Sequence, residues 1–550
     1  MTAPARRSPR SLALLLAGGL LAPCPAMAEP PPAANTPALA PLIDAGGARP
    51  LAGLAEGGSL RLPLAGAEGD YLRGELAVSR GRWRLDLVAA DGRHLRRLAA
   101  DVATVASFQF ILAAPGDTLV ATALAADALA TLTLSARVPR AAQRPPAEPP
   151  LSPAIAALAA RLAQGETTEA FWAEVGRAGT PLVESAPDGQ RLLTFLARGA
   201  RANVRLFGAP SGDHDWLARL GDSDVWFKSF LVPADTRLSY QLAPDVPELP
   251  GTPRERRAAL LATARADPLN RAPWPAVAPD AYNQDSTVTL PDAPAQPGLA
   301  ATGAPSGHLA TFPFASPRLG NVRDITIYRP AGFDPRDRRN ALLVVFDVRA
   351  YLTKVPTPAI LDALIAEGRL PPVLAVFVSE IDPATRAREL PGHPGFADML
   401  ADELLPRIRA ETGADIPAAR TILAGSSYGG LAAVTAALRR PERFANAIAL
   451  SGSFWWHPPD APADAPEHVA DRVAREPARK LRLHLSAGLF ERAHGDSAGI
   501  LDTSRHLRDV LRAKGYDVSY REYAGGHDYL VWRGALADAL LALAPRLDSP

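Results

Sequence analysis

The chain has 550 residues, 47% of them hydrophobic, so it is long enough for two or three domains with packed cores. Its 55 prolines indicate several linkers between those domains. The formal net charge is only +1, which gives no support to nucleic-acid binding.

Residues 1–28 have the pattern of a secretory signal peptide. Three arginines precede an apolar run over residues 12–21, and small residues end the segment at Ala28. The apolar run is too short for a permanent membrane-spanning helix. We therefore expect cleavage near Ala28 and a periplasmic or secreted protein with no stable membrane span.

Two other export routes stay open. Arg6 and Arg7 could mark twin-arginine export, and Cys24 could mark lipidation, although Pro23 fits a lipobox poorly. Cleavage would remove three arginines and the only cysteine, leaving a formal charge of −2 and no thiol for a disulfide or a cysteine–metal site. An exported chain without cysteine fits a bacterial periplasm.

The segments that follow indicate a first sheet domain between two linkers. Residues 29–58 are rich in Pro, Ala and Gly and are expected to be a disordered linker. Short alternating runs such as "RWRLDLVAA" and "SFQFILAA" predict a β-sandwich over residues 59–138. The proline-rich residues 139–153 are expected to form an extended linker.

A second sheet domain is expected over residues 154–271. It opens with an amphipathic helix, "AIAALAARLAQG", and continues with strands such as "DVWFKSFLVP", again typical of a β-sandwich. Residues 272–306 are rich in Pro and Ala and are expected to be a linker.

The pattern changes over residues 307–548, where strands alternate with helices. Runs such as "LLVVF" and "VLAVFV" are continuously apolar, as expected for strands that are buried on both faces. The order is that of an α/β-hydrolase with a mostly parallel sheet. The predicted protein is therefore multidomain, with two N-terminal β-sandwich domains before the catalytic domain.

Residues 421–430, "TILAGSSYGG", predict the nucleophile. An apolar strand enters the pattern G-x-S-x-G, and an alanine-rich helix leaves it. In such a nucleophile elbow the serine lies in a strained turn, so the positions two before and two after it must be small, as Gly425 and Gly429 are. We predict that Ser427 is the nucleophile, with a flexible Gly/Ser turn as the alternative.

A serine hydroxyl needs a base and an acid that orients the base. His527 lies in "YAGGHDYLVWR", after the last predicted strand, where this fold places its base. The acid should follow the preceding strand, and Glu491 is favoured by its position. Asp496 and Asp502 stay alternatives, as does a dyad without a close acid.

Two backbone amides are predicted to bind the oxyanion. One is that of Tyr428, at the start of the helix after Ser427. The other should come from the loop after the early strand in "LLVVFDVRAY", where the amide of Val348 or Arg349 is expected to serve.

Residues 424–458, "AGSSYGGLAAVTAALRRPERFANAIALSGSFWWHP", resemble the esterase-D type hydrolases, and most closely the enterochelin (ferric enterobactin) esterases. The stretches "IDPATRAREL" and "GGHDYLVWR" agree with that family, and "DVWFKSFLVPADTRLSYQL" resembles its N-terminal domain. The resemblance extends from about residue 154 to the C-terminus and leaves out residues 59–138.

The resemblance implies hydrolysis of the trilactone of a catecholate siderophore of the enterobactin type, the ferric form included. It also implies that Arg388 contacts the substrate. Arg349, beside the oxyanion loop, is a second candidate contact. Trp455 and Trp456 are expected either to form an aromatic wall beside the elbow or to pack in the core.

The sequence therefore predicts an exported serine esterase whose partner is a catecholate siderophore, with no cofactor and no protein-bound metal. The nearest alternative keeps the fold and changes the ester, as in a feruloyl or acetyl esterase or an acyltransferase. A second alternative is a periplasmic protein that binds a siderophore without cleaving it.

Overall fold

The computed structural model describes residues 46–143, 150–212, 214–300, 303–461, 467–493 and 498–547. The predicted signal peptide and most of the first predicted linker lie outside these residues. None of the described helices is long and apolar enough to cross a membrane.

The first region, residues 46–143, consists of two antiparallel sheets around one core. One sheet has the order β1-β8-β3-β6 and the other β2-β7-β4-β5. Leucines and aromatic residues of both sheets are buried together, among them Leu76, Trp83 and Phe108. The strands are β1 (Ala48–Leu51), β2 (Ser59–Pro63), β3 (Tyr71–Arg80), β4 (Trp83–Val88), β5 (His94–Val102), β6 (Val105–Ile111), β7 (Thr118–Ala123) and β8 (Leu129–Val138).

Strand β1 corrects the expectation of a linker over residues 29–58. It pairs antiparallel with β8, from Ala48 opposite Thr133 to Leu51 opposite Ala130. Leu51 is buried in the core of this region. The strand is only four residues long and contains Pro50, which an edge position tolerates. Its alternation is therefore too short to stand out from the proline-rich sequence around it.

The second region begins with helices α1 (Pro153–Ala163) and α2 (Glu169–Ala178). It contains two sheets, of order β12-β13-β10-β9 and β11-β14-β16-β15, whose residues share one core around Phe195, Trp226 and Tyr240. Its strands are β9 (Leu182–Ser185), β10 (Arg191–Arg198), β11 (Val204–Gly208), β12 (Ala218–Arg219), β13 (Val225–Val232), β14 (Arg237–Pro244), β15 (Pro273–Trp274) and β16 (Asp285–Thr289), and helix α3 spans Pro253–Leu261.

Strands β15 and β16 show that the predicted boundary at residue 271 is wrong. Both lie within residues 272–306, which were expected to form a linker. β16 pairs with β14, from Ser286 opposite Tyr240 to Thr289 opposite Arg237, and Val288 joins the core. The alternation in β16 covers only five residues, so it could not be recognised as a strand between the Pro/Ala-rich stretches on either side.

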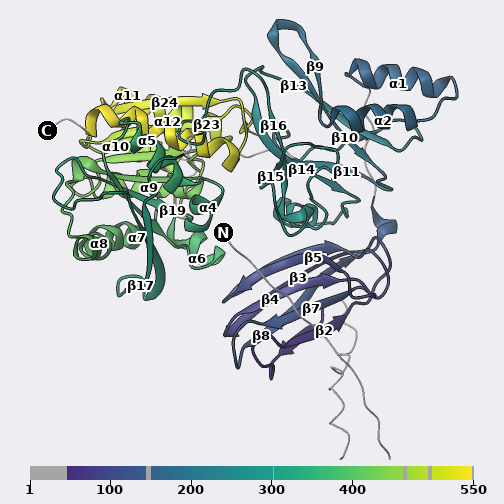
Figure 1. Cartoon of the computed structure of the whole chain (residues 1–550), viewed down its shortest axis with the longest axis horizontal. Helices are drawn as coiled ribbons and strands as arrows, with labels where there is room; N and C mark the ends of the chain where they lie inside the picture. The colour runs from purple at the N-terminus through teal and green to yellow at the C-terminus, as the bar shows by residue number, and fades with distance from the viewer. Residues whose placement is uncertain are drawn as a thin grey trace, which may run out of the picture. The chain divides into compact units, whose positions relative to one another are not determined.

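The third region contains an eight-stranded sheet of order β17-β18-β20-β19-β21-β22-β23-β24, formed by the part of the chain that runs from teal to yellow in Figure 1. β17 and β18 are antiparallel to their neighbours, and the other six strands, β19 to β24, run parallel to one another. The strands are β17 (His308–Ser316), β18 (Asn321–Arg329), β19 (Ala341–Phe346), β20 (Val373–Val378), β21 (Thr421–Ser426), β22 (Asn446–Leu450), β23 (Arg482–Gly488) and β24 (Asp517–Tyr523).

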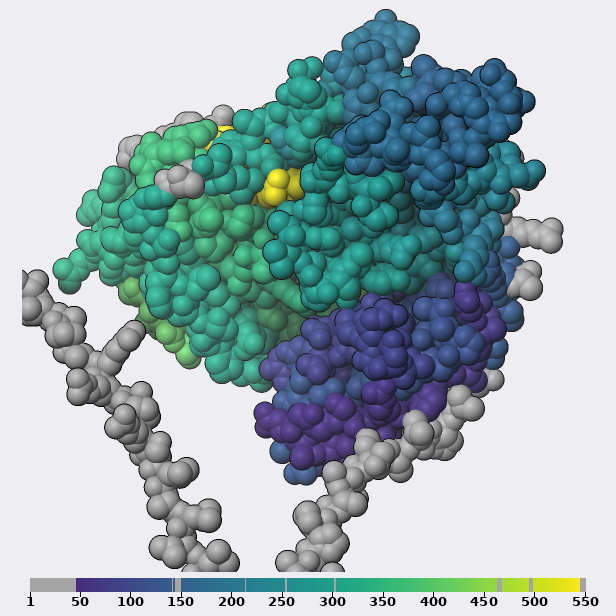
Figure 2. Space-filling model, turned by 45° about the vertical axis from the view of Figure 1, so that its right-hand side comes forward, coloured from purple at the N-terminus to yellow at the C-terminus, as the bar shows by residue number. Residues whose placement is uncertain are grey.

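Helices cover both faces of this sheet, as a sheet of buried parallel strands requires. Several helices pack in one core with side chains such as Val344 and Leu423, among them α7 (Pro394–Met399), α9 (Tyr428–Arg439), α10 (His468–Arg475) and α11 (Ile500–Ala513). Three pack in the opposite core with Val345 and Ala424, and these are α4 (Val348–Thr353), α5 (Thr357–Ala366) and α12 (Tyr529–Leu547). Helices α6 (Pro383–Glu389) and α8 (Leu405–Thr412) complete the region, with a π-helical turn at Leu400–Leu404. Little of the yellow C-terminal segment reaches the surface on the face shown in Figure 2.

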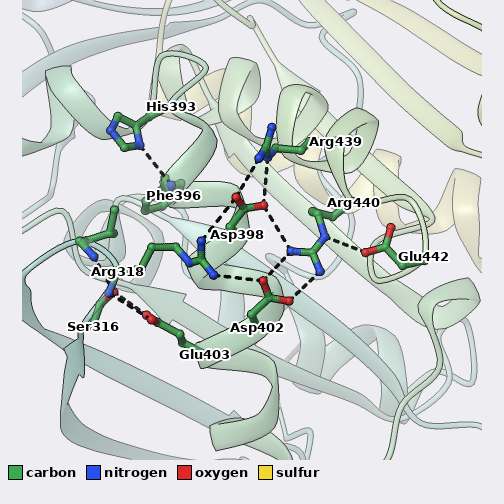
Figure 3. A network of polar contacts seen from close by, with 11 residues as sticks. Ser316, Arg318, His393, Phe396, Asp398, Asp402, Glu403, Arg439, Arg440 and Glu442 are labelled. Atoms are coloured by element: carbon green, nitrogen blue, oxygen red, sulfur yellow. Dashed lines mark hydrogen bonds and ion pairs between the residues drawn. The ribbon is translucent and has the colours of Figure 1, made fainter.

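A network of ion pairs joins the segment from α7 through the π-helical turn to the C-terminal end of α9 (Figure 3). Arg440 contacts Asp398 at 3.3 Å, Asp402 at 2.6 Å and Glu442 at 2.7 Å. Arg439 binds Asp398 with two nitrogens, at 2.9 and 2.8 Å. These pairs fix the end of the helix that begins at the nucleophile elbow.

Candidate active site

The elbow has the strand–turn–helix form expected from the sequence. β21 ends at Ser426 and α9 begins at Tyr428, and between them Ser427 has φ 57° and ψ −123°. A side chain at position 425 would place its Cβ 2.5 Å from the carbonyl carbon of Gly429. Only glycine therefore allows the helix to start this close to the strand, and the strained serine follows from that approach.

His527 and Glu491 come together in the structure. The Nδ1–H of His527 donates to Oε1 of Glu491 at 2.6 Å. His527 follows β24 and Glu491 follows β23, so both lie beyond the carboxyl ends of neighbouring parallel strands. The indole of Trp532 packs edge-on against the imidazole at 4.7 Å between ring centroids. This hydrogen bond leaves Nε2 as the proton acceptor of the neutral ring.

The carboxylate of Glu491 is buried and bound by several donors. Its Oε2 accepts from the amide of Gly488 at 2.5 Å and from the hydroxyl of Ser451 at 2.7 Å. Of the other predicted acids, Asp502 lies in the first turn of α11 and makes no hydrogen bond to His527, and Asp496 lies outside the described residues. Among the described carboxylates, Glu491 is thus the one placed to orient His527.

The hydroxyl of Ser427 shares a hydrogen bond of 3.3 Å with that of Ser453, and not with His527. The Ser427 amide donates to Leu450, and the next residue, Ser451, donates to Glu491. One turn after β22 therefore contacts both the elbow and the acid. A hydrogen bond between Ser427 and His527 therefore requires the Ser427 side chain to turn away from Ser453, and catalytic contacts of this kind commonly tighten when substrate binds.

The second predicted oxyanion position lies at the start of a helix. Val348 begins α4 directly after β19, and Asp347 before it has φ 60°. Arg386 holds the buried carboxylate of Asp347 through two hydrogen bonds, of 2.5 and 2.7 Å. Burial alone would lower the pKa of Arg386, but the hydrogen bonds and charge of Asp347 outweigh burial and raise the pKa of Arg386. The first amides of a helix have no acceptor within it, so those of Val348 and Tyr428 can bind an oxyanion.

The four predicted substrate contacts are placed differently. Trp455 is 36% exposed, and its ring lies 6.1 Å from that of Tyr428. Trp456 packs against the core and against His468, as the alternative expectation held. Arg388 is exposed and donates to Thr385 at 3.3 Å, and Arg349 is exposed on α4. Of these four residues, only Trp455 lines the cleft that contains His527 and Glu491.

A cleft of about 790 Å³ opens in front of His527 and Glu491. The second region supplies one wall and the third region the other. Its aromatic lining consists of Phe207, Tyr240, Trp274, Trp455, Phe490 and Tyr529. Its basic lining consists of His214, Arg257, Lys354, Arg492 and His527. Lys354 pairs with Asp285 at 3.6 Å, whereas Arg257 forms no ion pair with a described carboxylate.

Asp528, the residue after His527, connects the two walls of the cleft through a hydrogen bond. The amide of Ser239 in β14 donates to Oδ2 of Asp528 at 2.5 Å, and burial raises the pKa of Asp528. The amide of Arg237 donates to Ala524 at 2.9 Å. The second region therefore holds the loop that carries His527. The described residues contain no group of three or more His, Cys, Asp or Glu side chains that could hold a metal ion.

Sequence reasoning did not find Arg386, Arg257, Lys354 or Trp274 as site residues. Arg386 lies in "IDPATRAREL", two residues before Arg388, and the helical spacing of that stretch was its only signal. Arg257, Lys354 and Trp274 reach the cleft from separate elements, and no local pattern marks them.

Two family models match this chain. Residues 316–543 match the model of putative esterases, and residues 192–299 match the N-terminal domain of enterochelin esterases. The chain is 34% identical over 410 residues to the iron(III) enterobactin esterase of Dickeya dadantii, an alignment that covers 67% of this chain and 91% of the relative. It is 31% identical over 418 residues to the iron(III) salmochelin esterase of Escherichia coli, with 70% and 97% covered.

Solved structures agree with these matches. The enterobactin esterase of Shigella flexneri, crystallised in the presence of enterobactin, superposes with a TM-score of 0.56 at 29% identity and covers 68% of this chain and 97% of its own. The ferric enterobactin esterase of Salmonella typhimurium gives a TM-score of 0.57 at 30% identity, with 69% and 100% covered.

The fold and the site thus define a hydrolase of ester bonds with an N-terminal sheet-rich region and a C-terminal esterase domain. Within that class, the chain belongs to the family of the iron(III) enterobactin esterases.

Proposed function

We propose that this protein is an exported serine esterase that hydrolyses the trilactone of a catecholate siderophore of the enterobactin type, the ferric form included. The observation that carries the proposal is the hydrogen bond between buried Glu491 and solvent-accessible His527, which both line a cleft with aromatic and basic side chains. Relatives that are named for enterobactin and salmochelin hydrolysis support the substrate class.

The reaction follows from the geometry of the site. Ser427 Oγ turns from Ser453 toward Nε2 of His527, gives up its proton there and attacks the lactone carbonyl carbon. The amides of Tyr428 and Val348 bind the oxyanion. His527 returns the proton to the leaving alkoxide, and the ester bond of the lactone breaks. Water, deprotonated by His527, then attacks the acyl carbon, and His527 returns that proton to Ser427 Oγ as the acyl–serine bond breaks. Glu491 stabilises the imidazolium in both steps.

The cleft suits such a substrate in shape and charge. A ferric tris-catecholate is an anion whose outer faces are aromatic rings. Arginine and lysine side chains bind its oxygens through charge-assisted hydrogen bonds, and Trp274 and Trp455 offer faces for its rings. The volume of about 790 Å³ lies in the range of ligand sites, roughly 300–1,000 Å³.

The test is turnover of the purified protein lacking residues 1–28. Ferric and iron-free tricatecholate trilactones are compared with feruloyl esters, and the released linear products are separated by chromatography. We expect hydrolysis of the trilactones and its loss in Ser427→Ala, by about four orders of magnitude or more. Preference for the feruloyl esters would reject the siderophore. Binding of the ferric trilactone without any turnover by the wild type would favour a non-catalytic binding protein.

Export and the N-terminal architecture belong to the same proposal. The signal peptide predicted over residues 1–28 supports a periplasmic location, which fractionation of cells that express the full chain tests directly. We further propose that each N-terminal pair of sheets is a β-sandwich domain, since the strands of each pair share one core. The first of them, residues 46–143, lies outside both family matches.

A further inference from the structure

Arg257 reaches the cleft from helix α3 of the second region. Its Nη1 lies 3.1 Å from Nε2 of His214, and its guanidinium stacks over the ring of Phe207 at 5.2 Å. The rings of Phe207 and His214 are themselves 4.9 Å apart. All three residues line the same cleft as His527. The guanidinium is thus held over the cleft by aromatic contacts, with no described carboxylate to neutralise it.

The C-terminal end of the same helix is held by the first region. Arg96 in β5 donates to the carbonyl of Leu261, the last residue of α3, at 2.9 Å, and to that of Ala262, its C-cap, at 2.5 Å. A cation at these last carbonyls is favoured by the helix dipole. The guanidinium of Arg96 also stacks on the ring of Tyr282 at 3.9 Å, which keeps it in place.

Further contacts hold α3 along its length. Ala259 and Ala262 pack with the buried ring of Tyr71 from β3. Near the N-terminal end, Glu255, which closes the capping box with Thr252, lies 4.0 Å from Arg73. The helix is therefore packed between the first region and the cleft, and its position depends on both.

We propose that Arg257 is a specificity residue that binds the anionic oxygens of the substrate, and that the first region keeps Arg257 at the cleft by gripping α3 through Arg96. The inference rests on the proposed function for the identity of the ligand. It gives residues 46–143 a role in the active site: Arg96 is a positioning residue, which acts through α3 without touching the substrate.

The chemistry favours the ferric form of the substrate. Iron binding removes the catechol protons and leaves a multiply charged anion, whereas the iron-free trilactone keeps most of its catechol protons near neutral pH. A guanidinium without a carboxylate partner among the described residues attracts the first more strongly than the second. Arg257 should therefore set the preference between the two forms, while the Ser427 chemistry is common to both.

Binding measured apart from turnover tests the role of Arg257. Ser427→Ala serves as the background, and quenching of the fluorescence of Trp274 and Trp455 in the cleft reports the ligand. Adding Arg257→Gln should weaken binding of the ferric trilactone by about 10-fold, through loss of a charge-assisted hydrogen bond, and weaken the iron-free form clearly less. Arg257→Lys should recover part of the loss. Equal losses for both forms, or no loss, would overturn the role of Arg257.

A double-mutant cycle tests the role of Arg96. Arg96→Gln should weaken ferric binding by a smaller factor, about 3-fold, and should have no further effect once Arg257 is already Gln. Arg96→Lys should bind the ferric trilactone more tightly than Arg96→Gln does. The matched control is Arg80→Gln in the same region, at an exposed arginine that donates to the carbonyl of Asp127, and it should leave binding unchanged. Additive losses would show that Arg96 does not act through Arg257.

The outcomes separate this inference from the proposed function. If the wild type binds the ferric trilactone but does not cleave it, the proposed function fails and the binding cycle still decides the inference. If the wild type cleaves the trilactone and the cycle shows no coupling, the inference fails alone. If the ferric trilactone does not bind at all, both fail. Thermal unfolding of each variant shows whether lost binding reflects lost folding.

Discussion

The hydroxyl of Ser451 donates to Oε2 of Glu491 at 2.7 Å, and Oε1 of the same carboxylate accepts from His527. The indole nitrogen of Trp532, whose ring packs on His527, donates to the Ser451 hydroxyl at 2.9 Å. Serine, acid, base and tryptophan thus form a closed ring of contacts. The acid is fixed from both sides, so its shape and its charge both matter for the base.

Glu491→Gln should lower kcat for ester hydrolysis by about 10²- to 10⁴-fold. The amide has the size of the carboxylate, but it cannot stabilise an imidazolium and can favour the wrong tautomer of His527. Steady-state hydrolysis of the trilactone measures the change. Glu491→Asp, which keeps the charge, should lose less. A kcat within two-fold of the wild type in Glu491→Gln would show that His527 works without this acid.

Gly425→Ala should abolish hydrolysis, because the new Cβ would lie 2.5 Å from the carbonyl carbon of Gly429. The strand and the helix would have to separate, and the strained turn at Ser427 would relax. The matched control is Gly176→Ala in α2, where a Cβ meets no atom within 4 Å. It should leave activity intact and stabilise the fold by up to about 1 kcal/mol. An active Gly425→Ala enzyme would contradict the account of the elbow.

Arg440→Ala should destabilise the protein by about 1–3 kcal/mol, because it leaves Asp398, Asp402 and Glu442 facing one another with fewer cations. The Arg440 side chain is only 19% exposed, so its contacts are less screened than those of an exposed pair. Urea unfolding measures the change.

Arg409→Ala is the comparison for that measurement. Arg409 and Asp415 form a single pair at 3.1 Å with both side chains largely exposed. Its removal should change the free energy of unfolding by less than about 1 kcal/mol. Equal effects of the two substitutions would mean that the network in Figure 3 adds nothing to its separate pairs.

His484 makes stability depend on pH. Burial, with a smaller effect of Arg521, lowers its pKa from 6.5 to about 4. The unfolded chain therefore binds a proton below pH 6.5 that the folded chain takes up only near pH 4. This part of the stability is complete above pH 6.5 and falls by about 1.4 kcal/mol per pH unit as the pH drops toward 4.

Asn at position 484 removes this titration and can keep the contact with Ser519 that Nδ1 makes at 2.9 Å. Urea unfolding at pH 7, 5.5 and 4.5, with wild type and His484→Asn side by side, measures the difference. The loss of stability on acidification should be shallower in the variant. Parallel pH profiles would show that His484 is not the group responsible.

The sequence alone determined those elements that a short local pattern of residues predicts. The glycines around Ser427 permit the close approach of strand and helix that the elbow needs, and their place between an apolar strand and an alanine-rich helix indicated that elbow. The apolar runs of β19 and β20 identified strands buried on both faces. The motif "GGHDYLVWR" marked His527 by its place after the last strand, and the order of strands placed Glu491 before it.

The tertiary structure decided what depends on contacts between distant residues. β1 and β16 are too short, and too close to prolines, to be recognised until their partner strands are known. Arg388 and Arg386 are indistinguishable in sequence, but only Arg386 reaches Asp347. The cleft combines side chains of two regions far apart in the chain, so no local spacing could reveal Arg257 or its support by Arg96. Periodicity records which face of an element is buried, and it holds no information on which surface will cover that face.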